Sequence, residues 1–278
     1  MESTLALTDS EFLGFASKLK ERAGLHFTAA NRPILESRVL GRMKETDAPT
    51  AATYLQRISD DPRELDGLLD TVTTKLTRFF RNEPHMEALR DHVLPELMAT
   101  KTAGGSLHAV IWSAGCSTGE EVYSLAMLAD EVAAPGFTFE IVGSDISLSA
   151  ILHAQAGEYA PDRVANVPDR YLDRYFEKRG ERFAVSERLR RMTRFEYSNL
   201  HNDNGLRAVD VLFCRNVLIY FDAATQHRAA ERLFDAMAED GYLFIGHSES
   251  LHGLDIDLEL HRAGPALVYR KALGGQDR

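Results

Sequence analysis

The chain has 278 residues, and its composition of 44% hydrophobic and 27% charged side chains is typical of a folded globular protein. The 42 acidic and 32 basic side chains give a formal charge of −10. This charge argues against a general nucleic-acid binder, which needs basic residues to displace counterions from phosphates. Two cysteines are too few for a disulfide framework or a four-ligand zinc site, and we expect no metal.

The N-terminus carries acidic residues where a signal peptide needs basic ones. No stretch approaches the roughly 20 apolar residues of a membrane span. We therefore expect a soluble, cytoplasmic protein without membrane insertion.

Residues 1–95 are predicted to form an all-helical domain with a linker, because apolar residues recur there at helical spacing without strand alternation. The predicted elements are a helix capped by Asp9 or Ser10, a second helix with Pro33 in its first turn, and helices over 51–58 and 62–76. The second helix is locally basic, with Glu36 alone against Arg32, Arg38, Arg42 and Lys44.

After residue 105 the pattern changes to strands alternating with helices, which is the signature of a parallel sheet with crossover helices. Strands are predicted over 108–112, 138–142, 209–214 and 242–245, and helices over 120–132, 147–156, 168–176 and 222–238. Residues 183–185 and 192–197 are interpreted as a short antiparallel excursion, and 258–262 with 266–270 as a β-hairpin. The predicted fold class is α/β: residues 96–278 form a doubly wound, Rossmann-like domain that ends in an antiparallel hairpin.

Chemically active residues follow three of the predicted strands, and in an open parallel sheet ligands bind at these carboxyl ends. The loop from Gly115 to Glu120 combines small residues, which let a ligand approach the backbone, with acidic residues that favour a cation or an amine. Asp145 follows the next strand, where a carboxylate can accept hydrogen bonds from both ribose hydroxyls. Arg215 and Asn216 follow a third strand, and the Asn216 amide could hold an adenine edge or a carbonyl. A nucleoside with an ammonium tail is S-adenosylmethionine, and the terminal hairpin is expected of its methyltransferases.

Several stretches then resemble the CheR family, the chemotaxis receptor glutamate O-methyltransferases, in chain order from about residue 8 to 272. They are LTRFFR at 76–81, WSAGCSTGEEVYS at 112–124, GSDI at 143–146, FCRNVLIYFD at 213–222 and GHSES at 246–250. The resemblance implies an all-helical N-terminal domain joined to an S-adenosylmethionine methyltransferase domain with a small antiparallel β-subdomain, here at about 177–198.

The resemblance also implies which residues contact the cofactor. Asp145 would take the ribose hydroxyls, and Glu120 would lie near the methionine amino end. The remaining contacts would come from Thr77, Arg81, Gly115, Asn199, Leu200, Asn216 and Val217. Lys75 departs from the family, which usually has asparagine at this position.

The implied reaction transfers the methyl group of S-adenosylmethionine to glutamate carboxylates of chemoreceptors and leaves S-adenosylhomocysteine. A glutamate with a pKa of about 4.3 is already ionised at neutral pH, so the reaction needs no general base. A donor could keep the acceptor ionised and oriented while water is removed from it. We expect Arg81, Tyr220 or Arg215 in this role.

The implied partner is the cytoplasmic helical domain of a chemoreceptor, which carries acidic helix faces. The basic second helix suits such a partner, although a solvated helix face is the alternative. Some family members also bind a receptor tail at the β-subdomain. We expect no nucleic-acid partner, and a monomer is the default.

Other interpretations remain open at this point. A methyltransferase of this fold could act on a small molecule or another protein, and a non-catalytic module could hold the cofactor or a receptor without turnover. An NAD-dependent oxidoreductase is disfavoured because the glycine spacing after Ala114 does not fit the dinucleotide fingerprint. Some candidate residues also have structural alternatives. Thr77 and Arg81 are four residues apart, on one face of a helix, so Arg81 could pair with Glu83 or cap a helix. Phe79 and Phe80 could belong to the core, and Cys116 and Cys214 could be small buried hydrophobes.

Overall fold

The computed structural model describes residues 6–271, which form two compact units. The smaller unit comprises the described residues up to Thr74 together with Ile219–Gln226. The larger unit comprises Lys75–Leu218 and the described residues from His227 onward. The helical residues 83–103 thus belong to the larger unit, whereas residues up to 95 were expected to belong to the N-terminal domain with its linker.

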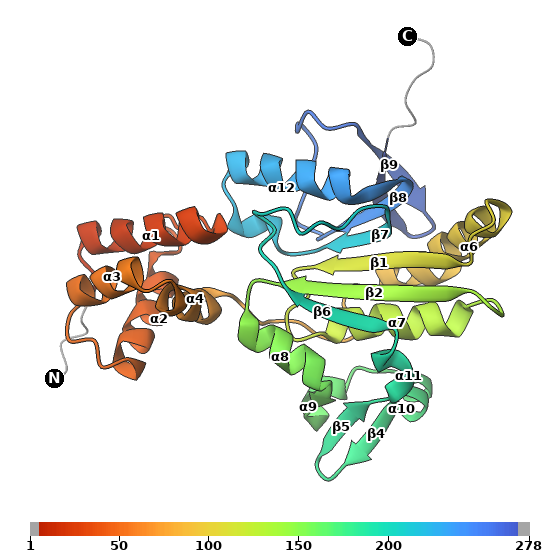
Figure 1. The fold of residues 1–278 in the computed structure, drawn as a ribbon, viewed down its shortest axis with the longest axis horizontal. Helices are drawn as coiled ribbons and strands as arrows, with labels where there is room; N and C mark the ends of the chain where they lie inside the picture. Colours follow the sequence, from red (N-terminus) through yellow and green to blue (C-terminus); the bar gives the residue numbers. More distant parts are fainter. Residues whose placement is uncertain (1–5, 272–278) are drawn as a thin grey trace. The chain divides into compact units, whose positions relative to one another are not determined.

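The smaller unit is built from four helices, as the sequence predicts (Figure 1). They are α1 (Asp9–Ala23), α2 (Arg32–Glu45), α3 (Ala51–Asp60) and α4 (Pro62–Val72). The cap of α1 is Thr8 rather than Asp9 or Ser10: its hydroxyl accepts from the Glu11 N–H while the Glu11 carboxylate accepts from the Thr8 N–H. The helix predicted to reach residue 76 ends at Val72. Residues 219–226 join this unit through the Tyr220 carbonyl, which accepts from the His26 N–H (2.8 Å).

The larger unit contains a seven-stranded sheet in the order β6-β2-β1-β7-β8-β10-β9. Its strands are β1 (His108–Ala114), β2 (Thr138–Asp145), β6 (Thr193–Tyr197), β7 (Val209–Cys214), β8 (Met237–Ile245), β9 (Leu258–Ala263) and β10 (Ala266–Lys271). Neighbours from β6 to β8 pair in parallel, and the hairpin β9–β10 adds antiparallel strands beside β8. The doubly wound sheet with a terminal hairpin is therefore confirmed.

Helices connect and cover these strands. Their bounds are α5 (Glu83–Ala88), the π-helical η1 (Leu89–Val93), α6 (Leu94–Ala103), α7 (Glu120–Val132), α8 (Leu148–Ala156), α9 (Pro161–Val164), α10 (Asp169–Tyr175), α11 (Glu187–Arg190), the 3₁₀ turn η2 (Leu218–Tyr220) and α12 (Ala223–Ala236). All six residues of β7 are buried, as expected for a central parallel strand covered on both faces. Within residues 6–271, no helix combines the length and apolar character needed to span a membrane.

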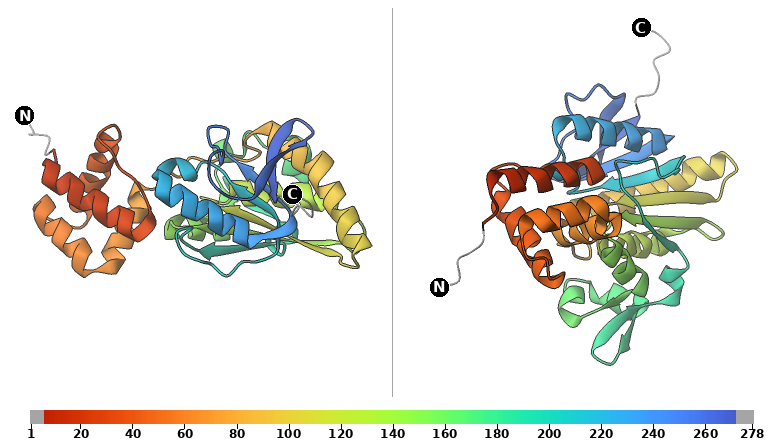
Figure 2. Two further views of the ribbon diagram at one scale, coloured as in Figure 1. Left: turned by 90° about the horizontal axis from the view of Figure 1, so that it is seen from above. Right: turned by 60° about the vertical axis from the view of Figure 1, so that its left-hand side comes forward.

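A separate three-stranded antiparallel sheet projects from the larger unit (Figure 2). It pairs β5 (Arg182–Val185) with both β3 (Glu158–Tyr159) and β4 (Phe176–Arg179). The expected pairing of 183–185 with 192–197 is wrong, because β6 pairs in parallel with β2 at the edge of the main sheet. The third strand of the small sheet is instead β3, which lies earlier in the chain and pairs with β5.

Candidate functional site

Asp145 ties together the loops that follow three strands. Its Oδ2 accepts from the Ser117 N–H and its Oδ1 from the Ser147 N–H, both at 2.8 Å. Its backbone carbonyl accepts from the Ser198 N–H (2.9 Å) in the loop after β6. The strand order places β2 between β1 and β6, so one half-buried residue organises this edge of the sheet.

The loop after β1 has a backbone that only small residues tolerate. Gly115 and Gly119 have φ of 79° and 94°, and Ser117 has φ of 51°. A Cβ added at Gly115 would lie 2.3 Å from a methyl carbon of Val217. The predicted residues Gly115 and Val217 are thus in close approach. The Ser117 hydroxyl is buried and has no hydrogen-bond partner among the described residues.

Asn199 and Leu200 follow β6 and are half-buried. The Asn199 side-chain oxygen accepts from the His201 N–H (2.8 Å), which shapes the turn. Leu200 lines a small pocket together with Trp112 and Arg207. The Ser198–Asp145 hydrogen bond places this turn beside the Asp145 loop.

Glu120 is fully buried, and its carboxylate is already engaged. Its Oε1 accepts from two nitrogens of Arg163, and its Oε2 accepts from the Thr118 hydroxyl (2.6 Å). In this arrangement Glu120 presents no surface to a ligand. The expected contact with the methionine amino end stays a prediction, and it requires that end to share the carboxylate with Arg163.

The TRFFR segment forms a loop rather than a helix, so Thr77 and Arg81 do not share a helical face. Phe80 adopts a positive φ of 52°. The Phe80 N–H donates to the hydroxyl of Ser124 on α7 (2.9 Å), which holds the loop there. Arg81 donates to the Leu76 carbonyl (3.2 Å) rather than pairing with Glu83.

The two phenylalanines of this segment pack against other aromatic rings, as the core interpretation predicts. Phe79 is 1% exposed and meets Tyr159 edge-to-face at 4.9 Å, and half-buried Phe80 stacks on Tyr171 at 4.9 Å. Burial raises the pKa of the Cys116 and Cys214 thiols, which fits inert hydrophobic side chains.

Arg215 is buried behind the site. Its Nη1 donates to Glu121 Oε2 (3.0 Å), and its Nη2 donates to the Arg81 backbone carbonyl (2.8 Å). Burial lowers the pKa of its guanidinium, and the Glu121 carboxylate opposes that shift. Only 3% of its side chain is exposed, so the expected direct contact between Arg215 and an acceptor is not available here. Arg215 instead connects the β7 end to the TRFFR loop.

Asn216 and Val217 follow Arg215 and are half-buried. Asn216 has φ of 60°, and its N–H donates to the Glu249 carboxylate (2.7 Å). Tyr220, in η2, is 38% exposed and belongs to the smaller unit. Lys75 donates to the hydroxyl of Ser149 on α8 (2.5 Å).

The basic residues of α2 divide into two pairs. Arg32 pairs with Asp9 and Glu36, and Arg42 pairs with Glu64 and Glu45. Arg38 and Lys44 are exposed.

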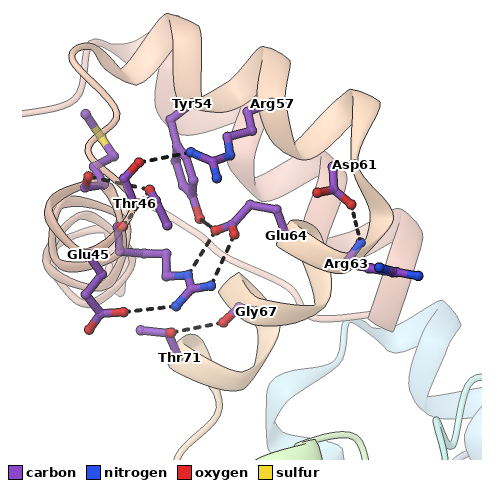
Figure 3. Close-up of polar contacts among 11 residues, drawn as sticks. Glu45, Thr46, Tyr54, Arg57, Asp61, Arg63, Glu64, Gly67 and Thr71 are labelled. Carbon is purple, nitrogen blue, oxygen red and sulfur yellow. Dashed lines mark hydrogen bonds and ion pairs between the residues drawn. The ribbon is translucent and has the colours of Figure 1, made fainter.

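Glu64 lies at the centre of a cluster that it forms with Arg42 and Tyr54, and Figure 3 shows its carboxylate beside the Tyr54 hydroxyl. Its carboxylate accepts two hydrogen bonds from Arg42 (2.9 and 3.1 Å) and one from the Tyr54 hydroxyl (2.8 Å). Burial raises the pKa of Tyr54, and its hydrogen bond to Glu64 adds to this. Arg42 therefore stabilises the helical unit internally.

Sequence reasoning missed four residues that shape the site. Ser117 and Ser147 act through backbone N–H groups, which residue identity does not signal. Arg163 lies 43 residues from Glu120, so no local pattern indicates their pairing. Glu249 was recognised within the GHSES stretch but was given no role.

The residues at this edge of the sheet fit S-adenosylmethionine. Asp145 is a carboxylate fixed by two N–H donors, and each of its oxygens can accept more than one hydrogen bond, as two ribose hydroxyls require. The buried Ser117 hydroxyl offers a further polar group. The carboxylates of Glu120 and Glu121 are paired with Arg163 and Arg215, so the fit rests on Asp145 and on the small residues of the loop after β1.

Comparisons with known proteins agree with the interpretation that this unit binds S-adenosylmethionine. The family model of the CheR methyltransferase all-alpha domain matches residues 10–73, and that of the CheR methyltransferase SAM-binding domain matches residues 75–265.

Three chemotaxis protein methyltransferases illustrate the similarity. The one from Borreliella burgdorferi is 32% identical over 238 residues, which cover 83% of this chain and 84% of that one. Chemotaxis protein methyltransferase 2 of Vibrio cholerae is 30% identical over 280 residues (98% and 96%). Chemotaxis protein methyltransferase 1 of Pseudomonas aeruginosa is 32% identical over 276 residues (96% and 99%).

Proposed function

Because the chain belongs to the CheR methyltransferase family and is an S-adenosylmethionine-dependent methyltransferase, we propose that it methylates glutamate side chains of chemoreceptors. The products are glutamate methyl esters and S-adenosylhomocysteine, and the reaction serves sensory adaptation in the cytoplasm. The observation that carries the proposal is the Asp145 carboxylate, which is fixed where the loops after β1, β2 and β6 meet.

In this proposal the cofactor lies along the carboxyl ends of the strands. Asp145 holds the ribose hydroxyls, and the loop from Gly115 lets the cofactor approach the backbone. The adenine end and the far side of the cleft are framed by Asn199, Leu200, Asn216 and Val217. Thr77 and Arg81 contact the cofactor from the TRFFR loop, and Glu120 contributes a negative charge near the methionine amino end.

The chemistry asks little of the protein beyond positioning. S-adenosylmethionine supplies a methyl group on a positively charged sulfur. A carboxylate oxygen can bond to this methyl carbon directly while the sulfur leaves as the neutral thioether. The acceptor glutamate is ionised at neutral pH, so the chain needs no general base. Arg81 and Tyr220 are the proposed donors that orient the acceptor oxygen and keep it ionised as water is excluded. Arg215 supports Arg81 by holding its backbone carbonyl.

The partner is a chemoreceptor with a helical cytoplasmic domain. We place its acidic helix faces against the exposed Arg38 and Lys44 of α2, since Arg32 and Arg42 are engaged in ion pairs within the protein. A receptor tail binds at the small antiparallel sheet, and the chain acts as a monomer.

The proposed function can be tested with methyl-tritiated S-adenosylmethionine and membranes that contain candidate chemoreceptors. We expect label in the receptor band and its release as volatile methanol in base, which marks a methyl ester. An Asp145→Asn variant should lose cofactor affinity by about tenfold or more, because it loses a charged acceptor worth about 1.5–3 kcal/mol. Base-stable label, or label on small molecules alone, would overturn the glutamate assignment.

A further inference from the structure

We propose that Glu249, in the GHSES stretch, is a positioning residue that holds Asn216 and Val217 in the backbone conformation required for cofactor binding. The inference rests on the proposed function, because it takes Asn216 and Val217 as cofactor contacts. None of the residues of the GHSES stretch has been given a contact with the cofactor or the acceptor, so its role would be to position other residues.

A single carboxylate oxygen of Glu249 joins two strand ends. Its Oε2 accepts from the Asn216 N–H (2.7 Å), just after β7, and from the Gly246 N–H (2.6 Å), just after β8. Both bonds are short and have an ionised acceptor, which makes them stronger than ordinary amide hydrogen bonds. The two loops are therefore locked to each other through one side chain.

Asn216 needs this support because its backbone is in the left-handed region, with φ of 60°. Residues with a Cβ adopt this region at an energetic cost, although asparagine tolerates it better than most. The Glu249 acceptor lies where the Asn216 N–H points in this conformation. Loss of the acceptor would leave that half-buried N–H without its charged partner and free Asn216 to return to a commoner conformation.

Gly246 fits the same arrangement. A Cβ at this position would lie 2.3 Å from Glu249 Oε2 and 2.9 Å from the Asn216 nitrogen. Glycine thus allows Glu249 to approach both N–H groups. The first and fourth residues of GHSES act together, whereas His247 and Ser248 are exposed.

The constraint extends from Asn216 to the loop after β1. Val217 has a methyl carbon 2.3 Å from where a Gly115 Cβ would be, so a shift of the 216–217 backbone would alter its fit against Gly115. On the other side, Arg215 is fixed by Glu121 and the Arg81 carbonyl. Residues 215–217 are therefore anchored at both ends, and Glu249 is the anchor nearest Asn216.

The experiment compares Glu249→Ala and Glu249→Gln with wild type in the full-length protein. Calorimetric titration with S-adenosylhomocysteine gives Kd, steady-state kinetics give the cofactor KM and kcat, and thermal melting gives Tm. We expect Glu249→Ala to raise Kd and KM at least tenfold with a smaller change in kcat. Glu249→Gln, which keeps the shape and a neutral acceptor, should be intermediate. The matched control is Glu239→Gln on β8, whose side chain is 91% exposed and which should leave all four values unchanged.

A second comparison tests whether Glu249 acts through Asn216. Glycine adopts the left-handed region without penalty, so Asn216→Gly should need the Glu249 acceptor less. Glu249→Ala should therefore raise Kd less in the Asn216→Gly background than in wild type. If Glu249→Ala lowers Tm but leaves Kd and KM at wild-type values, or raises Kd equally in both backgrounds, the inference is wrong. Failure of the wild-type protein to bind S-adenosylhomocysteine would instead overturn the proposed function itself.

Discussion

At the residue scale, His85 is a buried ring without a polar role in the proposed reaction. It meets Phe244 edge-to-face at 5.4 Å, and its Nδ1 has no hydrogen-bond partner among the described residues. Burial lowers the pKa of His85 from 6.5 to about 4, and the positive charge of Arg215 adds to the shift. The folded protein therefore favours the neutral ring.

This depressed pKa predicts a loss of stability in acid. Above pH 6.5 the ring is neutral in both the folded and unfolded states, so it imposes no proton-linked cost. As the pH falls from 6.5 towards 4, the unfolded state takes up the proton first, and about 3 kcal/mol of unfolding free energy is lost. Denaturant unfolding of wild type and His85→Phe between pH 4 and 8 measures this. The difference between the two proteins should change across that window, and a constant difference would contradict the prediction.

A second prediction at the residue scale concerns the stability that the ion pair between Glu64 and Arg42 contributes. Glu64 is 7% exposed and accepts from both Arg42 and Tyr54, so removing Arg42 leaves a buried charge with its main partner missing. Arg42→Ala should lower the unfolding free energy by about 3 kcal/mol. Arg38→Ala is the control, because it removes the same side chain from an exposed position of the same helix. Equal losses in the two variants, measured by denaturant unfolding, would show that the ion pair contributes nothing.

At the element scale, hydrophobic periodicity predicted most helices and strands, but it did not predict which strands pair with each other. The bounds of α7 follow directly from its apolar spacing, and β1, β2 and β7 from their apolar runs. Two errors share a physical cause. The chain at 73–82 leaves the helix because contacts to α7 and Arg215, far away in sequence, hold it as a loop. Likewise β6 joins β2, since strand pairing is decided by the whole sheet rather than by neighbouring sequence.

The close approach of two loops makes Gly115 an element-scale test. Gly115 and Gly105 share a φ of 79°, so alanine imposes the same backbone strain, about 1–2 kcal/mol, at either position. Nothing lies within 4 Å of a Cβ at Gly105, whereas Val217 lies 2.3 Å from one at Gly115. Gly115→Ala should therefore cost about 1–3 kcal/mol more than Gly105→Ala. Thermal or denaturant unfolding of the pair isolates the contact, and equal costs would mean that the loops are not tightly apposed.

At the scale of the whole molecule, candidate site residues could be proposed from the sequence, whereas the ion pairs of the α2 cations could not. Asp145, Gly115 and Asn216 could be proposed because the residues at strand ends are recognised from local sequence, and the structure places all three at the carboxyl ends of β2, β1 and β7. The commitment of Arg42 to Glu64 could not, because 22 residues separate them. A count of charges in the sequence therefore does not distinguish the four cations of α2, although only Arg38 and Lys44 among them are exposed.

The net charge of −10 would disfavour an acidic receptor, so local charge must decide the encounter. Arg38→Glu should lower the rate of receptor methylation severalfold at low salt and weaken its salt dependence, because one attractive charge becomes repulsive. The control is Arg63→Glu, which makes the same charge change at an exposed residue of α4 in the same unit. Methylation rates from 20 to about 300 mM salt, a range over which screening becomes strong, compare the two variants. S-adenosylhomocysteine affinity should stay at the wild-type value in both. An equal loss in Arg63→Glu would mean that net charge, and not the α2 surface, governs docking.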